Sequence, residues 1–144
     1  MIRHAGLIAC RAGGAWRGAL IEGPSGVGKS DLALRALDQG FALVADDRTL
    51  LFVSNGKLHG RAPAALAGLI ETRGIGVLSH PYRPFCPVDL LVRCMDGPGA
   101  VERLPEPMFE TLEGVVTPVL ELWPLEPGAP GKIRRMFEHL GVAD

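Results

Sequence analysis

The apolar and polar positions of this chain fall into short runs that predict more strands than helices. Residues 4–10 form one apolar run, and residues 17–22 form another after the turn-forming pair Gly13-Gly14. Two such runs around a pair of glycines are typical of a hairpin. We therefore expect the chain to open with two antiparallel strands.

A helix and a buried strand are predicted next. Residues 31–39 have the composition of a helix, and Gly40 provides its stop signal. Residues 41–47 begin as a continuous apolar run and end in Asp46-Asp47. Such a run is typical of a buried strand, and ligands of α/β sheets gather at its carboxyl end. The two carboxylates are thus predicted at a ligand-binding edge of the sheet.

The middle of the chain predicts a second hairpin, a short helix and a loop. Residues 49–53 and 57–60 flank Asn55-Gly56, and Asn-Gly at a strand reversal is a strong hairpin signal. Residues 63–70 begin with a proline, which suits the first turn of a short helix. Residues 80–87 contain three prolines and predict a loop.

The last third predicts two more strands and a final helix. The strands are expected at 88–94 and 115–123, with Pro118 favouring an edge or a bulge. Between them, residues 95–114 predict a surface excursion, and a linker is expected at 124–130. The helix is predicted over 132–140, closed by Gly141, with one apolar stripe formed by Ile133, Met136, Phe137 and Leu140. The stripe predicts packing against the domain or against a neighbouring subunit.

Composition narrows the class of protein. The chain has 144 residues, 47% hydrophobic and 22% charged, with a formal net charge of −1. These values are ordinary for a globular protein, and we expect one domain over residues 1–144. The near-neutral charge argues against a nucleic-acid binder, and no apolar run is long enough to cross a membrane. Without a signal-like N-terminal segment, a cytoplasmic location is expected.

The three cysteines predict neither disulfides nor a zinc site. Cys10, Cys86 and Cys94 are odd in number and form no Cys-x-x-Cys pair. Cys10 and Cys94 lie in apolar runs and are expected to be buried. Cys86 lies in the proline-rich loop, where nothing favours a nucleophilic role.

The clearest chemical signal is a phosphate-binding loop. Its eight residues fit G-x-x-x-x-G-K-[ST], the Walker A pattern, and are Gly23, Pro24, Ser25, Gly26, Val27, Gly28, Lys29 and Ser30. A predicted strand precedes the motif and a predicted helix follows it, which is the context that the motif requires. Glycines allow backbone N–H groups to approach an anion, Lys29 reaches the terminal phosphates, and Ser30 is placed to bind Mg²⁺. The sequence therefore predicts binding of a nucleoside triphosphate with Mg²⁺. Because this strand enters from a hairpin rather than a parallel unit, a mixed sheet is favoured.

Asp46 and Asp47 are candidates for the chemistry of phosphoryl transfer. They lie sixteen and seventeen residues beyond Ser30, a span largely occupied by one helix, so the fold can bring them back to the phosphates. One acid can serve the metal shell, directly or through water, and the other can accept a proton from an attacking hydroxyl. Taken alone, an Asp-Asp pair before Arg48 is more often a solvated turn. The apolar strand and the phosphate loop before it reverse that preference.

Four further residues carry weaker signals. Glu71 and Arg73, beside glycines, form a pattern that is usually a surface ion pair. His4 at a strand start is most often structural, and Arg103 in a loop would ordinarily be solvated. None of them identifies a site on its own.

Together these segments resemble the catalytic domain of the HPr kinase/phosphorylase family. The resemblance rests on His4-Ala5-Gly6, the phosphate loop, Val44-Ala45-Asp46-Asp47-Arg48 and Ile70-Glu71-Thr72-Arg73-Gly74-Ile75-Gly76. The order and most of the spacings agree over about the first half of the chain. The resemblance implies an α/β phosphate-loop kinase domain with a mixed sheet, similar to phosphoenolpyruvate carboxykinase. It implies phosphorylation of a serine of HPr or a relative with ATP as the phosphate donor, and a homo-oligomer, with a hexamer possible.

The resemblance also implies roles for single residues. Lys29 would bind phosphate, Ser30 and Glu71 would bind Mg²⁺, and Asp47 would be the base that takes the proton from the substrate serine. Asp47 would then be the acid in the reverse, phosphate-dependent reaction. His4, Asp46, Arg73 and Arg103 would support catalysis.

Three differences from the family pattern limit what is implied. The chain begins almost at His4, as in a short form of some proteobacteria, and residues 5–22 include an extra Gly13-Gly14 turn. The segment after Pro118 matches poorly the region linked to dephosphorylation, so kinase activity is the firmer expectation.

Three functions remain open from the sequence. The first is a protein-serine kinase acting on HPr. The second is a small-molecule kinase, with residues 80–87 or 95–114 as a lid. The third is a nucleotide-sensing protein without catalysis, against which the intact acid pair argues.

Overall fold

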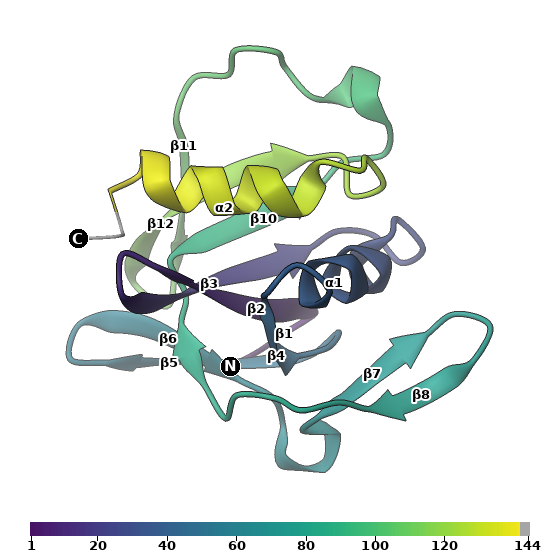
Figure 1. Cartoon of the computed structure of the whole chain (residues 1–144). Helices are drawn as coiled ribbons and strands as arrows, with labels where there is room; N and C mark the ends of the chain where they lie inside the picture. The colour runs from purple at the N-terminus through teal and green to yellow at the C-terminus, as the bar shows by residue number, and fades with distance from the viewer. Residues whose placement is uncertain (142–144) are drawn as a thin grey trace.

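The computed structural model describes residues 1–141, which form three layers (Figure 1). Two helices form one outer layer, a large sheet forms the middle, and a smaller sheet forms the other outer layer. The strands are β1 (Ile2–Arg3), β2 (Ala5–Ala12), β3 (Ala15–Glu22), β4 (Ala42–Ala45), β5 (Thr49–Ser54), β6 (Lys57–Arg61), β7 (Leu69–Thr72), β8 (Gly76–Ser79), β9 (Cys86–Pro87), β10 (Leu90–Cys94), β11 (Met108–Leu112) and β12 (Val115–Leu122). The helices are α1 (Lys29–Leu37) and α2 (Ala129–His139).

The middle layer is a six-stranded mixed sheet in the order β11-β12-β10-β3-β2-β4. β3, β10 and β12 run parallel to one another, whereas β2 pairs antiparallel with both β3 and β4. β3 is thus both the second strand of a hairpin and the strand that leads into the phosphate loop. The prediction of an α/β fold with a mixed sheet is confirmed.

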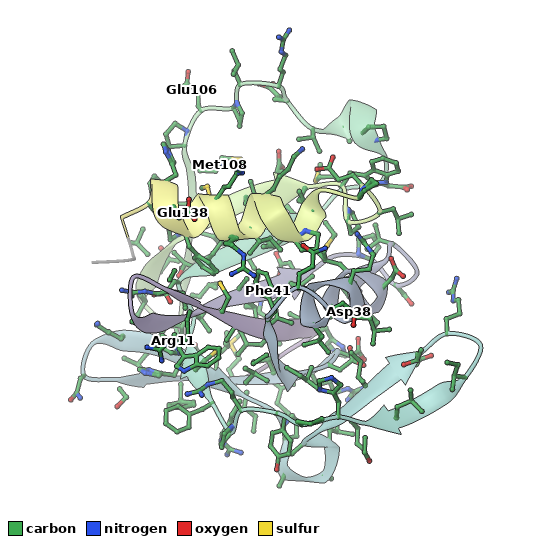
Figure 2. All side chains as sticks on the ribbon, viewed as in Figure 1. Arg11, Asp38, Phe41, Glu106, Met108 and Glu138 are labelled. Carbon is green, nitrogen blue, oxygen red and sulfur yellow. The ribbon has the colours of Figure 1, made fainter. Side chains whose placement is uncertain are left out.

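The two helices cover one face of this sheet. Ile133 and Phe137 of α2 are fully buried, and Met136 and Leu140 pack against the same core, so the predicted apolar stripe lies against the domain. Phe41, before β4, lies beneath α2 in Figure 2, with the Arg134 guanidinium carbon 4.8 Å from the centre of its ring. These contacts fix the helical layer, and with it the start of α1.

The smaller sheet covers the other face. Its order is β1-β5-β6-β9, and its inner side chains, among them Leu51 and Leu58, meet Leu7, Leu20 and Leu91 of the large sheet. The separate β7–β8 hairpin extends from the body of the protein near α1 (Figure 1). Within residues 1–141, no helix has the length and apolar character needed to span a membrane.

Several local predictions are confirmed. The Gly13-Gly14 and Asn55-Gly56 turns join antiparallel pairs, and the helix before Gly40 and the strand before Asp46 lie where they were expected. Cys10, Cys86 and Cys94 are all buried and free. Burial raises the pKa of the Cys86 thiol, in keeping with the absence of any signal for a nucleophile.

Other local predictions are wrong. The helix expected at 63–70 is only a 3-10 turn, Ala64–Leu66, because Gly68 (φ 75°) turns the chain so that Ile70 can enter β7 with its side chain buried. The excursion at 95–114 contains β11, and the loop at 80–87 ends in β9. The last helix begins at Ala129, with Pro130 in its first turn, which shortens the expected linker.

Pro118, which was predicted at an edge or a bulge, lies at a local edge. It lies in β12, the second strand of the sheet, opposite Phe109 of β11. Pairing with β10 begins only at Val119, so at Pro118 the strand has a neighbour on one side alone. A proline is tolerated there because no N–H is needed toward β10.

Candidate functional site

The phosphate loop joins β3 to α1 and ends in a left-handed glycine. Gly28 has φ 115° and precedes the first helical residue, Lys29. The first N–H groups of a helix have no partners within it, and the helix dipole favours negative charge at this end. Val27 is buried and anchors the loop to the core, which leaves the backbone around it free to face an anion.

Lys29 folds back over the loop that carries it. Its ammonium donates to the carbonyl oxygens of Gly23, at 2.7 Å, and of Pro24, at 3.2 Å. The charge is thereby held above the concave side of the loop, where it can pair with phosphate oxygens.

Asp46 ties three segments of the chain together. The Ser30 hydroxyl donates to Asp46 Oδ1 at 3.0 Å, and the backbone N–H of Glu71 donates to Asp46 Oδ2 at 2.9 Å. Burial raises the pKa of this carboxyl, and the bonds from Glu71 and Ser30 oppose that increase. One carboxylate thus positions both the Ser30 hydroxyl, at the start of α1, and the backbone of Glu71, in β7.

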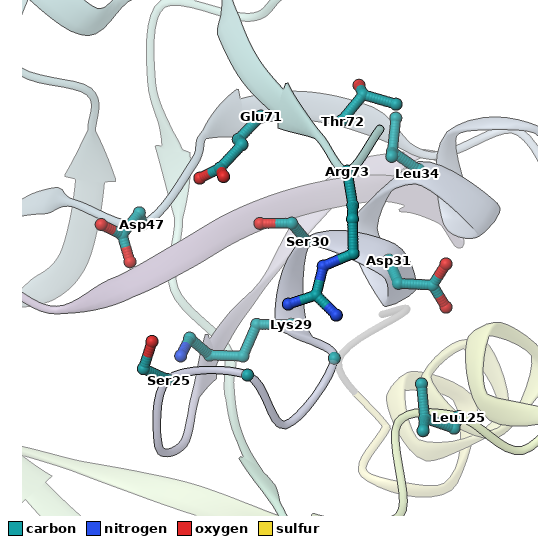
Figure 3. Close-up of a pocket in the computed structure, with 12 residues that line it drawn as sticks. Ser25, Lys29, Ser30, Asp31, Leu34, Asp47, Glu71, Thr72, Arg73 and Leu125 are labelled. Atoms are coloured by element: carbon teal, nitrogen blue, oxygen red, sulfur yellow. The ribbon is translucent and has the colours of Figure 1, made fainter. Parts of the chain in front are cut away.

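The Asp47 side chain points in a different direction from that of Asp46 because the backbone turns at Asp47. Its φ of 66° lies in the left-handed region, which aspartate tolerates better than most residues. The Asp47 carboxylate consequently faces the pocket (Figure 3), while the Asp46 carboxylate accepts hydrogen bonds from Ser30 and Glu71. Adjacent acids therefore point to different surroundings.

A cavity of about 570 Å³ lies between the phosphate loop, α1, Asp47 and the turn after β7. In Figure 3, Asp47 lies at one end of the pocket, and Lys29, Ser30 and Arg73 lie in its middle. The other end is formed by Asp31, Leu34 and Leu125. The predicted residues Lys29, Ser30, Asp47, Glu71 and Arg73 are thus brought together around one space.

A second cavity, of about 350 Å³, adjoins the same acids. Asp47 and Glu71 line both cavities, and Leu66, Leu69 and Val77 supply an apolar rim to the second. A group can therefore approach Asp47 from a side different from that of the phosphate loop.

The donor set suits a small divalent cation bound together with phosphates. The Ser30 hydroxyl and the Glu71 carboxylate face each other across the pocket in Figure 3. Among residues 1–141, no three His, Cys, Asp or Glu side chains form a cluster that could hold a metal by themselves. The arrangement suits Mg²⁺, because this ion usually binds one or two protein oxygens and completes its coordination shell with phosphate oxygens and water.

Two of the residues predicted to act in catalysis line neither cavity. His4 is exposed between β1 and β2, two residues before Gly6, where an added Cβ would lie 3.4 Å from the Ala45 oxygen. It therefore lies at the sheet edge that carries the acids. Arg103 is exposed and belongs to the segment between β10 and β11. That segment lies at the top of Figure 1, far in that view from β7 and β8.

Sequence reasoning missed the residues at the far end of the pocket. Leu125 belongs to the segment predicted as a linker, and Leu34 and Asp31 lie on the pocket side of α1. Nothing in the local sequence distinguishes them from ordinary helix and linker residues. Only the three-dimensional approach of the β12–α2 connection to the phosphate loop identifies them.

Comparison with known proteins points to one family. Residues 14–81 match the HPr serine kinase C-terminal domain. An HPr kinase/phosphorylase of Brevibacillus brevis is 36% identical over 126 residues, which cover 87% of this chain and 32% of that protein. An HPr kinase/phosphorylase of Leptothrix cholodnii is 50% identical over 62 residues, covering 42% of this chain and 19% of that protein. The chain thus spans a third or less of the length of these relatives.

The fold agrees along nearly the whole chain. The structure of the HPr(Ser) kinase/phosphatase from Coxiella burnetii superposes with a TM-score of 0.82 and 26% sequence identity. The match covers 99% of this chain and 91% of that chain. The chain is thus similar in sequence to the HPr kinase/phosphorylases and in fold to the HPr(Ser) kinase/phosphatase.

Proposed function

We propose that this chain is an ATP- and Mg²⁺-dependent kinase that phosphorylates a serine of the phosphocarrier protein HPr or of a close relative. The observation that supports this most strongly is the bridge from Asp46 to Ser30 and to the Glu71 amide. That bridge leaves Asp47 directed into the pocket beside Lys29. The names of the relatives supply the acceptor.

Binding of the triphosphate uses the loop and its flanking charges. Backbone N–H groups around Gly26 and Gly28 hold phosphate oxygens, and Lys29 pairs with the terminal phosphates. Ser30 and Glu71 would hold Mg²⁺, which when bound neutralises charge on the phosphates. Arg73, in the middle of the pocket, adds a second cation beside the phosphates.

The transfer itself needs one proton acceptor. The hydroxyl oxygen of the substrate serine forms a bond to the γ-phosphorus, the bond from that phosphorus to the bridging oxygen of ADP breaks, and the hydroxyl proton passes to Asp47. The second cavity gives the serine a path to Asp47 that the triphosphate does not occupy. In the phosphate-dependent reversal, an oxygen of inorganic phosphate would form a bond to the phosphorus of the phosphoserine and the bond from that phosphorus to the serine oxygen would break. Asp47, protonated by the incoming phosphate, would give its proton to the serine oxygen. His4 and Arg103 would join this site only if the chain segments that carry them move toward it.

The test is transfer of labelled phosphate from Mg·ATP to purified HPr, with phosphoserine identified by mass spectrometry. Asp47→Asn removes the proton acceptor but keeps the shape, so we expect the rate to fall by about 100-fold or more. Asp38→Asn, an exposed change on the far end of α1 (labelled in Figure 2), should leave the rate unchanged. Transfer at the normal rate by Asp47→Asn would contradict the role of Asp47.

Further acceptors separate the alternatives. Transfer to a metabolite without any protein acceptor would favour a small-molecule kinase, and tight ATP binding without transfer would favour a nucleotide sensor. Incubation of phosphorylated HPr with inorganic phosphate tests the reverse reaction, which is expected to be lost in the same Asp47→Asn variant.

A further inference from the structure

The connection between β12 and α2 lies against the phosphate loop. An added Cβ at Gly28 would lie 2.7 Å from Leu125 Cδ2 and 3.5 Å from Pro124 Cγ. Leu125 therefore rests directly on the backbone of the loop, at a position where only glycine leaves room for it. Its side chain is nevertheless 51% exposed, and its exposed part faces the pocket.

Arg35 holds this connection in place. Its guanidinium, on α1, donates to the carbonyl oxygen of Glu126 at 3.1 Å and also to that of Pro124. These carbonyls belong to the two residues on either side of Leu125. Arg35 Nε additionally donates to Asp31 at 2.9 Å, which fixes the guanidinium on the helix. The apolar side chain is thus presented to the pocket by a charged clamp behind it.

The two ends of the pocket differ in chemistry. The end at Asp47 and Lys29 carries the groups for phosphoryl transfer, so the γ-phosphate of a bound triphosphate lies there. The nucleoside must then extend toward the opposite end, where Leu125 and Leu34 present apolar surface. Flat heteroaromatic bases bury apolar area against such side chains.

We propose that Leu125 is the main contact for the nucleoside of the bound triphosphate and that Arg35 is the residue that positions it. This inference rests on the proposed function, because it places a nucleotide in the pocket. It goes further by assigning the nucleoside to a segment outside the phosphate loop. Leucine offers no hydrogen bonds to a base edge. The contact should therefore strengthen binding of any ligand that carries a base, without distinguishing adenine from guanine.

The experiment compares ligands with and without a nucleoside. Binding of Mg·ATP, Mg·GTP and Mg·tripolyphosphate is measured by calorimetry on the whole chain and on Leu125→Ala. Loss of the leucine contact should weaken ATP and GTP each by about tenfold, and leave tripolyphosphate unchanged. Leu104→Ala is the matched control, because Leu104 is 87% exposed and lies outside the pocket.

Arg35→Ala tests the positioning role. It should weaken ATP without weakening tripolyphosphate, and combining it with Leu125→Ala should add little, because both changes remove the same contact. Additive losses would overturn the role of Arg35 as a positioning residue.

Each remaining outcome is decisive. Equal losses for ATP and tripolyphosphate in Leu125→Ala would overturn the nucleoside contact, since the leucine would then act on the shape of the phosphate loop. Unchanged ATP binding in that variant would overturn it as well, and leave the proposed kinase intact. Failure of the unaltered protein to bind either ligand would instead refute the proposed function, and this inference with it.

Discussion

Replacing Asp46 by asparagine gives the sharpest test of how the site is built. Asp46 accepts one hydrogen bond from the Ser30 hydroxyl and one from the Glu71 amide. Asparagine keeps the shape but has only one oxygen, so it can accept from only one of these donors. The Glu71 N–H can only donate a hydrogen bond, whereas the Ser30 hydroxyl can also accept one from the new NH₂ group. We therefore expect the Ser30 contact to change direction.

The reversal should affect cation binding more than folding. A Ser30 hydroxyl that donates to Asp46 keeps its lone pairs for Mg²⁺, but one that accepts from asparagine has a lone pair occupied and its hydrogen directed elsewhere. A hydrogen bond to a charged group contributes about 1.5–3 kcal/mol, which corresponds to about 10- to 100-fold in affinity for Mg·ATP. Folding should change little, because the substitution also removes a carboxylate whose burial raises its pKa.

Calorimetry with ATP, in the presence of Mg²⁺ and then with EDTA, separates the two effects. Asp46→Asn should lose affinity for Mg·ATP and retain most of its affinity for metal-free ATP, while thermal unfolding stays close to that of the unaltered protein. Asp38→Asn should behave as the unaltered protein in all three measurements. If Asp46→Asn binds Mg·ATP normally, the bridge does not orient Ser30 and the reasoning is wrong.

Three further predictions concern stability, pH and reactivity. Gly18→Ala should lower the free energy of unfolding, measured in urea, by about 3 kcal/mol, because its Cβ would lie 2.0 Å from the Pro87 oxygen. Gly99→Ala should lower it little, because no atom lies within 4 Å of an added Cβ there. Similar urea midpoints for the two variants would contradict the packing of β3 on β9. Because burial raises the pKa of Asp46, the folded chain binds the carboxyl proton more tightly than the unfolded chain does. The unfolding free energy of the unaltered protein, relative to that of Asp46→Asn, should therefore rise as the pH falls through the raised pKa. A difference between the two proteins that stays constant from pH 7 to pH 4 would refute this prediction. The three buried cysteines should resist a thiol reagent in the native protein and react after denaturation, and rapid native labelling would show that the core opens.

Much of the fold follows from local pattern. The Gly13-Gly14 and Asn55-Gly56 turns specify their own hairpins, since left-handed glycines allow tight reversals between apolar runs. The phosphate loop likewise follows from its own residues, because it needs a strand before it and a helix after it. The final helix is specified by its spacing of Ile133 and Phe137, whose burial confirms the predicted stripe.

The rest depends on contacts between segments distant in sequence. β11 pairs along its whole length with β12, and its Glu110 pairs with Arg3 and Arg93 of other strands at 2.8 and 2.7 Å. Leu125 belongs to a connection whose position depends on Arg35, ninety residues earlier in the chain. Neither relation has a local signature, so neither could be predicted from periodicity or turn chemistry.

The side chains of the adjacent residues Asp46 and Asp47 have different surroundings. In a regular strand, successive side chains point to opposite faces, which would send one carboxylate into a core. Here β4 ends at Ala45, Asp46 bonds across to α1 and to β7, and the left-handed backbone of Asp47 turns its carboxylate toward the pocket instead. The Arg48 amide then donates to the Asp46 carbonyl oxygen at 2.7 Å, which closes this turn. The pair is therefore two adjacent acids in separate surroundings: Asp46 bonds to Ser30 and Glu71, and Asp47 faces the pocket, where we propose that it takes the proton of the acceptor.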